Sequence, residues 1–379
     1  MPDESDNIYF CDYMDIARQR LSRTFLAGST WTSGRDVVRA LGAVQAQDYE
    51  GAKWALSQRT RAATDSLIER EFASGEILRT HVLRPTWHFV DPTDIRWMLA
   101  LTGPRIAKSM ASYDRKLELD DTVYRRSHAA IENALRGGIH LTRTELRAIL
   151  EHAGVNTLGV QRAAHLMMRA ELDALICSGA RRGKQFTYAL LDERVPAVAP
   201  IDRDEALLRL TRSYFRGRSP ATANDFGWWS GLAMVDVKRG LEIAGAELEK
   251  MMIEGDAYWA IGDNSVPRPK PSAHLLPNYD EFFIGYRNRS AIGKRLKSVK
   301  AVTGGNALIA HVVALDGQLV GGWRRTVERD AVVLNLKLLT RLSAPEQKRL
   351  LREAGRFASF VGAPVELRGL GAKRRVSPR

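Results

Sequence analysis

The chain has 379 residues and is 45% hydrophobic, so we expect two or three domains with buried cores and exclude a disordered chain. Its 57 Lys and Arg outnumber its 44 Asp and Glu, and the formal net charge of +13 predicts an anionic partner: nucleic acid, a membrane surface or a phosphorylated ligand. Only two cysteines, Cys11 and Cys177, are present, which excludes a disulfide framework and a zinc cluster.

Targeting and cofactor signals are missing from the sequence. No apolar run approaches the roughly 18 residues that a membrane span needs, and the acidic start at residues 1–6 does not resemble a signal peptide. The segment Gly179–Lys184 comes nearest to a phosphate-binding loop, but it is one residue short and lacks the following Ser or Thr. We therefore expect a cytoplasmic protein, associated with the nucleoid when it binds DNA, with no membrane contact, metal or nucleotide cofactor.

The first third of the chain has the element order of a winged helix. Apolar spacing predicts helices over 16–26, after Ser33 and over 66–74. Segments rich in β-formers follow at 77–83 and 86–90, separated by Arg84 and Pro85. Three helices followed by a two-stranded ribbon indicate a winged helix.

The same order recurs twice. Helices are predicted over 127–135, after Thr142 and over 159–176, followed by a ribbon at 176–177 and 186–191. A third round has helices over 206–215, 222–232 and 237–244 and a strand over 257–261. The periods are unequal and the sequences dissimilar, so we infer three structural units and no sequence repeat.

The last part of the chain changes character after a proline-rich stretch at 266–278. Strands at 308–315 and 318–323 flank Asp316 and Gly317, a strong signal for a tight hairpin. A third strand covers 332–338, and a capping box at Ser343 begins a helix. We predict an α+β protein with three tandem winged-helix units and a C-terminal β-barrel with a closing helix. The units are expected at 1–122, 123–200 and 201–265, and the linker with the barrel at 266–379.

Four segments together resemble a known family. They read LGAVQAQD at 41–48 with WAL at 54–56, RTHVLRPTWHFV at 79–90, PATANDFGWWSGL at 220–232 and LPNYDEF at 276–282. In this order they resemble the winged-helix DNA glycosylases of the AlkZ/YcaQ type across nearly the whole chain. The resemblance implies the same fold of three tandem winged helices and a β-barrel, and double-stranded DNA as the substrate.

The resemblance also implies a catalytic pair. Gln45-Ala46-Gln47 matches the Gln-x-Gln motif of the AlkZ-like branch, which is associated with excision of bulky alkylated purines and unhooking of interstrand crosslinks. An amide cannot take up a proton at neutral pH, but it can hold a water through its carbonyl oxygen and favour an oxocarbenium ion. Because an N7- or N3-alkylated purine is already cationic, it leaves as a neutral base without a general acid.

The spacing allows Gln45 and Gln47 to act together, since residues two apart in an extended segment face the same way. The alternative is that both amides only form local capping bonds at a helix end. Asp48 could orient a water or, as we favour, cap the helix that carries Trp54. The segment 279–282 contains two carboxylates, and we favour a structural turn over an acid–base role for it.

Candidate DNA contacts come from basic and polar side chains on the expected wings and on one helix face. Each group has a simpler interpretation, either packing under the ribbon or lying on a solvated surface. The candidates are His81, Arg84 and His88 on the first wing, Gln161, Arg162, His165 and Arg169 on the last helix of the second unit, and Arg181, Arg182 and Lys184 on the second wing.

Two functions remain open at this level. The first is a monomeric, monofunctional DNA glycosylase that needs no metal, and the second is a winged-helix transcriptional regulator without catalysis. The Gln pair discriminates between them, because a regulator has no use for two convergent amides away from its recognition helix. The sequence lacks the acidic cluster that a Mg²⁺-dependent nuclease would need. No lysine lies closer to the glutamine pair than Lys53, so Schiff-base lyase chemistry is unsupported.

Overall fold

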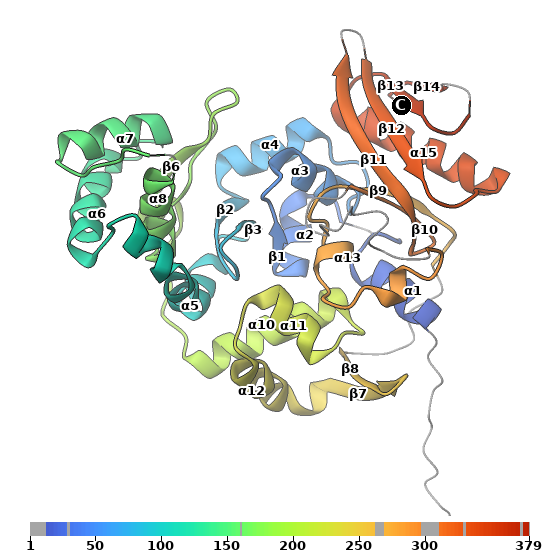
Figure 1. The fold of residues 1–379 in the computed structure, drawn as a ribbon, viewed down its shortest axis with the longest axis horizontal. Helices are drawn as coiled ribbons and strands as arrows, with labels where there is room; N and C mark the ends of the chain where they lie inside the picture. Colours follow the sequence, from blue (N-terminus) through green and yellow to red (C-terminus); the bar gives the residue numbers. More distant parts are fainter. Residues whose placement is uncertain are drawn as a thin grey trace, which may run out of the picture.

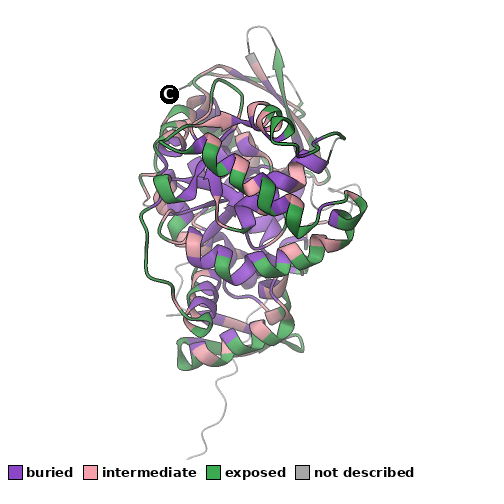
Figure 2. Cartoon of the chain, turned by 90° about the vertical axis from the view of Figure 1, so that its left-hand side faces the viewer, coloured by how far each residue is buried: buried purple, intermediate pink, exposed green. Residues whose placement is uncertain are grey.

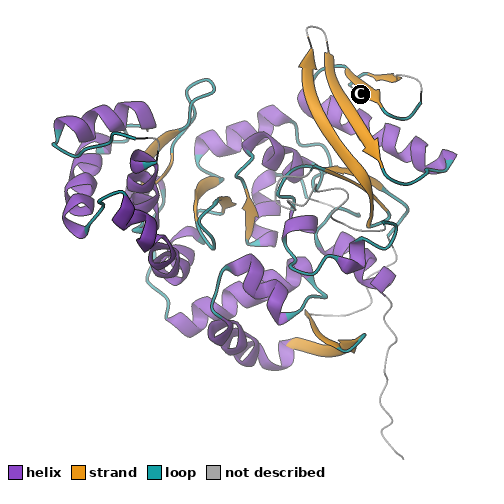
Figure 3. Ribbon diagram, viewed as in Figure 1, coloured by secondary structure: helices purple, strands orange, loops and turns teal. Residues whose placement is uncertain are grey.

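The computed structural model describes residues 13–28, 31–159, 161–261, 269–296, 311–328, 331–371 and 374–378. The expected strand at 308–315 and the proline-rich stretch therefore lie partly outside the described residues. Cys11 lies outside them as well. Helices and sheets alternate along the chain. In the view of Figures 1 and 3 the helices near residues 34–74 lie in the middle, with the C-terminal sheet at the upper right. In the described part of the chain, no helix combines the length and apolarity that a bilayer crossing requires.

The first helical unit contains three helices and a small antiparallel sheet. Its strands follow the order β1-β3-β2, so β3 lies between the other two. Ser33, Asp48 and Thr64 begin the three helices, each with its side chain accepting a hydrogen bond from the first turn. The elements are α2 (Gly34–Leu41), β1 (Ala43–Gln45), α3 (Tyr49–Ser57), α4 (Asp65–Ser74), β2 (Leu78–His81) and β3 (Trp87–Val90).

A long helix that the sequence analysis did not predict, α5 (Ile95–Lys116), joins the first unit to the second. The second unit repeats the topology of the first with strand order β4-β6-β5. Its first helix begins at Asp121, six residues earlier than predicted, because Asp120 caps it. The elements are α6 (Asp121–Leu135), β4 (Leu141–Thr142), α7 (Arg143–His152), α8 (Arg162–Leu172), β5 (Ile176–Ser178), β6 (Thr187–Leu190) and the short α9 (Leu191–Arg194).

A third set of helices ends in a two-stranded ribbon. Here the place of the first strand is taken by a single bridge between Ala221 and Trp259. The ribbon has one strand, at 248–253, that the sequence analysis missed. The elements are α10 (Arg203–Arg218), α11 (Ala223–Ser230), α12 (Met234–Ala244), the 3₁₀ turn η1 (Gly245–Glu247), β7 (Leu248–Ile253) and β8 (Asp256–Ile261).

The C-terminal part forms a curled six-stranded sheet in the order β14-β13-β12-β11-β10-β9. Within the described residues its edges, β14 and β9, do not pair with each other, so the expected barrel is a half-barrel. The predicted turn at Asp316 and Gly317 is confirmed, with φ of 51° and 79°. The elements are β9 (Ala273–Leu276), α13 (Glu281–Ile284), η2 (Ser290–Ile292), β10 (Val312–Leu315), β11 (Gln318–Glu328), β12 (Ala331–Leu338), α15 (Ala344–Val361), β13 (Val365–Arg368) and β14 (Arg374–Val376).

The first unit and the C-terminal sheet share one hydrophobic core. Trp54 of α3 packs on Phe357 of α15 with ring centroids 5.0 Å apart, and its indole N–H donates to the Leu275 carbonyl at 2.7 Å. The first helix, α1 (Tyr13–Arg23), was predicted to belong to the first unit. Instead it packs through Ala17 and Leu21 on the C-terminal sheet. Figure 2 shows buried residues gathered in the interior and exposed residues along the outward faces of the helices.

Candidate active site

Gln45 is the last residue of β1, where it lies opposite His88 of β3. The chain reaches this strand through Gly42, which follows α2 with φ of 77°. A larger residue is disfavoured here by the positive φ, and its Cβ would lie 2.0 Å from the Ser213 hydroxyl oxygen, so the Ser213 side chain would have to shift. The tight exit from α2 therefore places Gln45 in extended backbone, as its predicted role requires.

The Gln45 side chain is 3% exposed, and its neighbours are polar. Its backbone N–H donates to Glu281 Oε1 at 2.8 Å, and its side-chain Oε1 accepts from Arg84 Nη2 at 2.7 Å. A carbonyl oxygen carries two lone pairs, so the contact with Arg84 leaves one acceptor position. Gln45 is thus held at both its backbone and its side chain.

Gln47 is exposed, and its Oε1 accepts from the backbone N–H of Trp87 at 3.3 Å. Between the two glutamines, the Ala46 N–H donates to the Trp87 carbonyl at 2.7 Å, so pairing with β3 continues beyond the end of β1. The Ala46 carbonyl accepts from Arg79 Nε at 3.0 Å. The backbone is therefore anchored on both sides of the pair, and convergence of both amides on one sugar stays a prediction.

Glu281 is a buried carboxylate that joins three parts of the chain. Besides the Gln45 N–H, it accepts from Arg218 Nη2 at 2.6 Å and Nε at 3.1 Å, and from Trp229 Nε1 at 3.0 Å. Arg218 also donates to the carbonyls of Leu41 and Ala43, which flank Gly42. The active-site strand is thus positioned by α13 and by the third helical set, a role the sequence analysis did not assign to Glu281.

The favoured structural interpretation of the segment 279–282 agrees with these contacts. Asp280, 1% exposed, accepts two bonds of 2.8 Å from Arg59 and caps α13 through the Phe282 N–H. Both carboxylates of the segment are therefore engaged inside the protein. The favoured role of Asp48 is confirmed too: it caps α3 by accepting from the Gly51 N–H at 3.1 Å.

Arg84 connects the glutamine pair to an aromatic residue of α11. Its guanidinium carbon lies 5.5 Å from the ring centroid of Trp228, and Arg289 lies 5.8 Å from the same ring. Burial lowers the pKa of Arg84 to about 10, with the Glu281 carboxylate acting in the opposite direction, so the side chain is charged at neutral pH. Trp228 and Arg289 received no role from the sequence, although Trp228 lies in one of the segments that carry the resemblance.

Two histidines expected on the first wing lie inside the protein. His81 is 7% exposed; its Nδ1 pairs with Glu171 of α8, and its ring stacks on Trp87 at 4.4 Å. His88 is fully buried, with Nδ1 at 2.9 Å from the Thr86 carbonyl. This burial argues against direct DNA contact by either histidine. The second unit covers His81 through Glu171, whereas His88 lies near Arg84 and Arg218.

Burial of neutral histidines predicts acid sensitivity. Burial lowers the pKa of His88 well below its ordinary value and that of His274 in β9 to about 3. Between about pH 6.5 and pH 3 these imidazoles take up protons in the unfolded chain but stay neutral in the folded protein. The free energy of unfolding therefore falls as the pH falls. From pH 7 to pH 5, His274 should contribute a loss of about 2 kcal/mol, measured by urea unfolding at both pH values. Between pH 7 and pH 5 the free energy of unfolding of His274→Gln should fall by about 2 kcal/mol less than that of the wild type. A fall as large as that of the wild type would contradict the assignment.

The expected polar stripe of the second unit mostly faces its neighbours. Arg162 is 8% exposed and donates to the carbonyls of Asn156, Leu117 and Glu118. His165 Nδ1 lies 2.8 Å from Asp114 of α5, and Arg169 Nε donates to Asp173 at 2.8 Å. Of the four predicted contacts on this helix, only Gln161 is exposed. Arg162 therefore serves the packing of this unit, and for His165 and Arg169 a DNA contact would compete with the contacts to Asp114 and Asp173.

The second wing is partly bound to the first unit. Arg181 pairs with Glu69 of α4 at 3.1 Å and with Glu50 of α3 at 3.4 Å. Arg182 is exposed but pairs with Glu145 of α7. Lys184 is exposed, and it lines a cavity between the first and second units. Lys184 is thus the wing residue whose position best suits a bound anion.

Comparison with known proteins places this geometry in a class. The solved structure of Streptomyces sahachiroi DNA glycosylase AlkZ matches with a TM-score of 0.78 at 22% identity, covering 94% of this chain and 99% of that one. The fold is thus that of a DNA glycosylase. A curated interstrand DNA cross-link repair glycosylase from the same organism is 24% identical over 362 residues, 92% of this chain and 97% of its own length. The family described as DNA glycosylase AlkZ-like matches residues 38–360, and the chain belongs to it.

Proposed function

We propose that this protein is a monofunctional DNA glycosylase that hydrolyses the N-glycosidic bond of N7- or N3-alkylated purines, including those in interstrand crosslinks. The observation that carries the proposal is the anchored Gln45-Ala46-Gln47 segment in a member of the AlkZ-like family. The crosslink component is supported by the similarity to the Streptomyces interstrand DNA cross-link repair glycosylase.

The proposed chemistry uses amides where many glycosidases use carboxylates. The free lone pairs of the Gln45 and Gln47 carbonyls would hold the attacking water, and their dipoles would favour the positive charge that develops on the sugar. Arg84, which donates to Gln45, keeps that amide from rotating. Its charge would also suit a phosphate next to the reacting sugar. Because the alkylated base is cationic, it leaves as a neutral molecule when the glycosidic bond breaks, and no buried carboxyl group has to donate a proton. The water that bonds to the sugar carbon releases its proton to solvent.

The absence of strand cleavage is supported by the state of Lys53. Its Nζ lies 2.9–3.0 Å from Glu50, Asp65 and Glu69. Burial lowers the pKa of Lys53, but the three carboxylates raise it by more than that, so the net shift is upward and the amine stays protonated. A protonated amine is not a nucleophile. We therefore propose that the product is an intact abasic strand.

We further propose that the three helical units are winged helices, spanning 1–122, 123–200 and 201–265, which act as a monomer on double-stranded DNA in the cytoplasm. The shared strand orders β1-β3-β2 and β4-β6-β5 support the first two, and the bridge at Ala221 supports the third. Within the described residues no group of three metal-ligating side chains occurs. Arg84, Gln161, Arg182 and Lys184 are the predicted DNA contacts that remain compatible with their surroundings.

The test is release of free base from DNA with a chelator present. Purified protein is incubated with a duplex carrying radiolabelled N7-methylguanine, and with one carrying a bulkier N7 adduct. We expect release of the modified base from at least one duplex, with the strand uncleaved until it is heated in alkali. If neither adduct is released, the glycosylase proposal is wrong, and a DNA-binding regulator is the better description.

Affinity for DNA should depend strongly on salt and weakly on sequence. Each phosphate neutralised by Lys or Arg contributes about −0.9 to the slope of log affinity against log salt. For several such contacts we expect affinity for an undamaged duplex to fall by about ten- to several-hundred-fold between about 50 and 200 mM salt. Fluorescence anisotropy with two unrelated duplex sequences measures both dependences. A flat salt response would show that phosphate neutralisation does not drive binding.

A further inference from the structure

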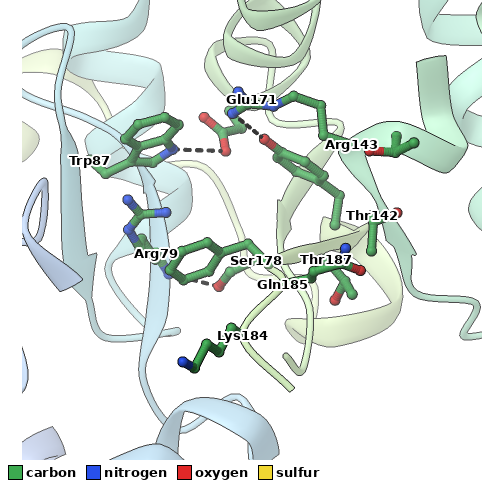
Figure 4. A pocket seen from close by; sticks show the side chains of 12 residues that line it. Arg79, Trp87, Thr142, Arg143, Glu171, Ser178, Lys184, Gln185 and Thr187 are labelled. Carbon is green, nitrogen blue, oxygen red and sulfur yellow. Dashed lines mark hydrogen bonds between the residues drawn. The ribbon is translucent and has the colours of Figure 1, made fainter. Parts of the chain in front are cut away.

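A cavity of about 390 Å³ lies between the first and second helical units. Its volume falls in the range of small-ligand sites. Arg79 of β2 and Trp87 of β3 line it from one side, and Arg143, Glu171 and Lys184 line it from the second unit (Figure 4). This cavity received no role in the glycosylase chemistry above.

Arg79 is the central feature of the cavity. The residue is 8% exposed, and its guanidinium lies between two aromatic rings, 4.3 Å from the Trp87 centroid and 4.5 Å from that of Phe186. Nε donates to the Ala46 carbonyl at 3.0 Å, and the backbone N–H donates to Ser178 Oγ at 2.8 Å. Among the described residues its two terminal nitrogens have no hydrogen-bond partner. A rigid, planar fork of donors is thus held in place next to an open space.

The charges around the cavity favour an anion. Arg143 donates to the Tyr188 hydroxyl at 3.1 Å, and Lys184 is exposed at the rim. The buried carboxylate, Glu171, is already engaged by His81 and by the Trp87 indole N–H at 3.4 Å. Burial lowers the pKa of Arg79 to about 10, so it remains charged at neutral pH. The Glu171 carboxylate offsets part of this cost of burial by raising the pKa of Arg79, and a bound anion would stabilise the buried cation further.

The first turn of α7 adds further donors. Thr142 caps this ten-residue helix, and Thr144, its second residue, is exposed and lines the cavity. The N-terminus of a helix attracts anions through its partial positive charge. With Arg79 on the opposite wall, an oxyanion between them would meet donors from both units.

We propose that this cavity binds a phosphate ester, held by the Arg79 fork together with Lys184 and the start of α7. Phosphate matches the planar donor geometry of arginine. In DNA the ester would be one backbone phosphate, a source that rests on the proposed function. Trp87 links the two sites, since its indole lines the cavity and its backbone N–H donates to Gln47. A phosphate held here would set the register of the strand relative to the glutamine pair.

The test places a negative charge at the rim without disturbing the core. Thr144→Glu adds an anion at the second position of α7, where an acidic residue suits the helix. Thr122→Glu is the matched control, because Thr122 is also the exposed second residue of a helix, α6, and does not line the cavity. Lys184→Ala removes a cation from an exposed position. Replacing Arg79 itself would also break its bond to Ala46, so the rim variants carry the test.

Two probes are used with each variant: inorganic phosphate, followed by ³¹P line broadening, and an undamaged duplex, followed by anisotropy. We expect Thr144→Glu and Lys184→Ala to weaken binding by about tenfold or more relative to Thr122→Glu, the scale of one lost charge-assisted contact. Loss of both phosphate and duplex binding assigns the site to a DNA phosphate. Loss of phosphate binding with unchanged duplex affinity assigns it to a free phosphate ester. Unchanged binding of both probes overturns the proposal.

Base release is measured separately on the same proteins at saturating DNA. A wild type that releases no base, while the rim variants still lose phosphate or duplex binding, would refute the glycosylase function and leave the phosphate site standing. A wild type that releases base, with rim variants that bind both probes normally, would refute the phosphate site alone. The two proposals therefore fail in different ways.

Discussion

Replacing Glu281 with alanine should lower the free energy of unfolding by about 3–5 kcal/mol, the usual cost of removing one partner of a buried ion pair. Arg218, fully buried, would keep its charge but lose the carboxylate it contacts through two nitrogens. The Gln45 and Trp229 N–H groups would lose their acceptor as well. Urea unfolding of wild type and variant at neutral pH measures the difference.

Glu281→Gln is the matched control, because it keeps the shape and one acceptor oxygen while removing the charge. We expect it to lie between wild type and Glu281→Ala in stability. If it folds, its base-release rate at saturating DNA should fall while its affinity for DNA stays near wild type, since Glu281 positions the Gln45 backbone and has no route to solvent of its own. A Glu281→Ala variant within about 1 kcal/mol of wild type would contradict this role.

Alanine at Gln45 or at Gln47 should slow base release by about ten- to a hundred-fold, which corresponds to about 1.4–2.7 kcal/mol of transition-state stabilisation. An amide that holds the attacking water acts mainly on the transition state, so affinity for duplex DNA should change little. Single-turnover release from N7-alkylated duplex measures the rate, and anisotropy measures the affinity. Gln45→Ala also leaves Arg84 without its acceptor, so its unfolding midpoint is checked in parallel.

Gln347→Ala provides a matched glutamine control on α15, where the side-chain amide donates to the Leu342 carbonyl at 3.1 Å. This variant should release base at the wild-type rate. The double variant Gln45→Ala/Gln47→Ala should be less active than either single variant, though by less than the product of the two effects if both amides hold one water. Wild-type rates in both single variants would remove the catalytic role from the pair.

Much of the fold follows from local signals in the sequence. The capping box at Ser343, the turn at Asp316 and Gly317, and the start signals at Ser33 and Thr142 each mark an element that the structure contains. These signals depend on hydrogen bonds within a few residues, so they survive without knowledge of the tertiary structure. By contrast, α5 went unpredicted, and α1 was assigned to the wrong neighbour because its apolar face does not say what it packs against.

The candidate DNA contacts show where sequence reasoning stops. Arg162, His81 and His88 were selected as polar residues on expected wings and on a helix face, yet all three are buried. For His81 the burial comes from a contact between units, its pairing with Glu171, 90 residues apart. Arg162 is buried against the backbone carbonyls of Asn156, Leu117 and Glu118. Spacing along a helix identifies a face, but only packing decides whether that face meets solvent or another element.

The sequence by itself determined the family resemblance, many of the helices and strands, and the glutamine pair, because each depends on residue identity and short-range spacing. Only the tertiary structure decided how that pair is held. Glu281 reaches Gln45 across 236 residues, and Arg218 reaches Ala43, the first residue of the same strand, across 175. Buried charges must find partners wherever the fold supplies them, and those partners lie on elements whose approach no local pattern specifies.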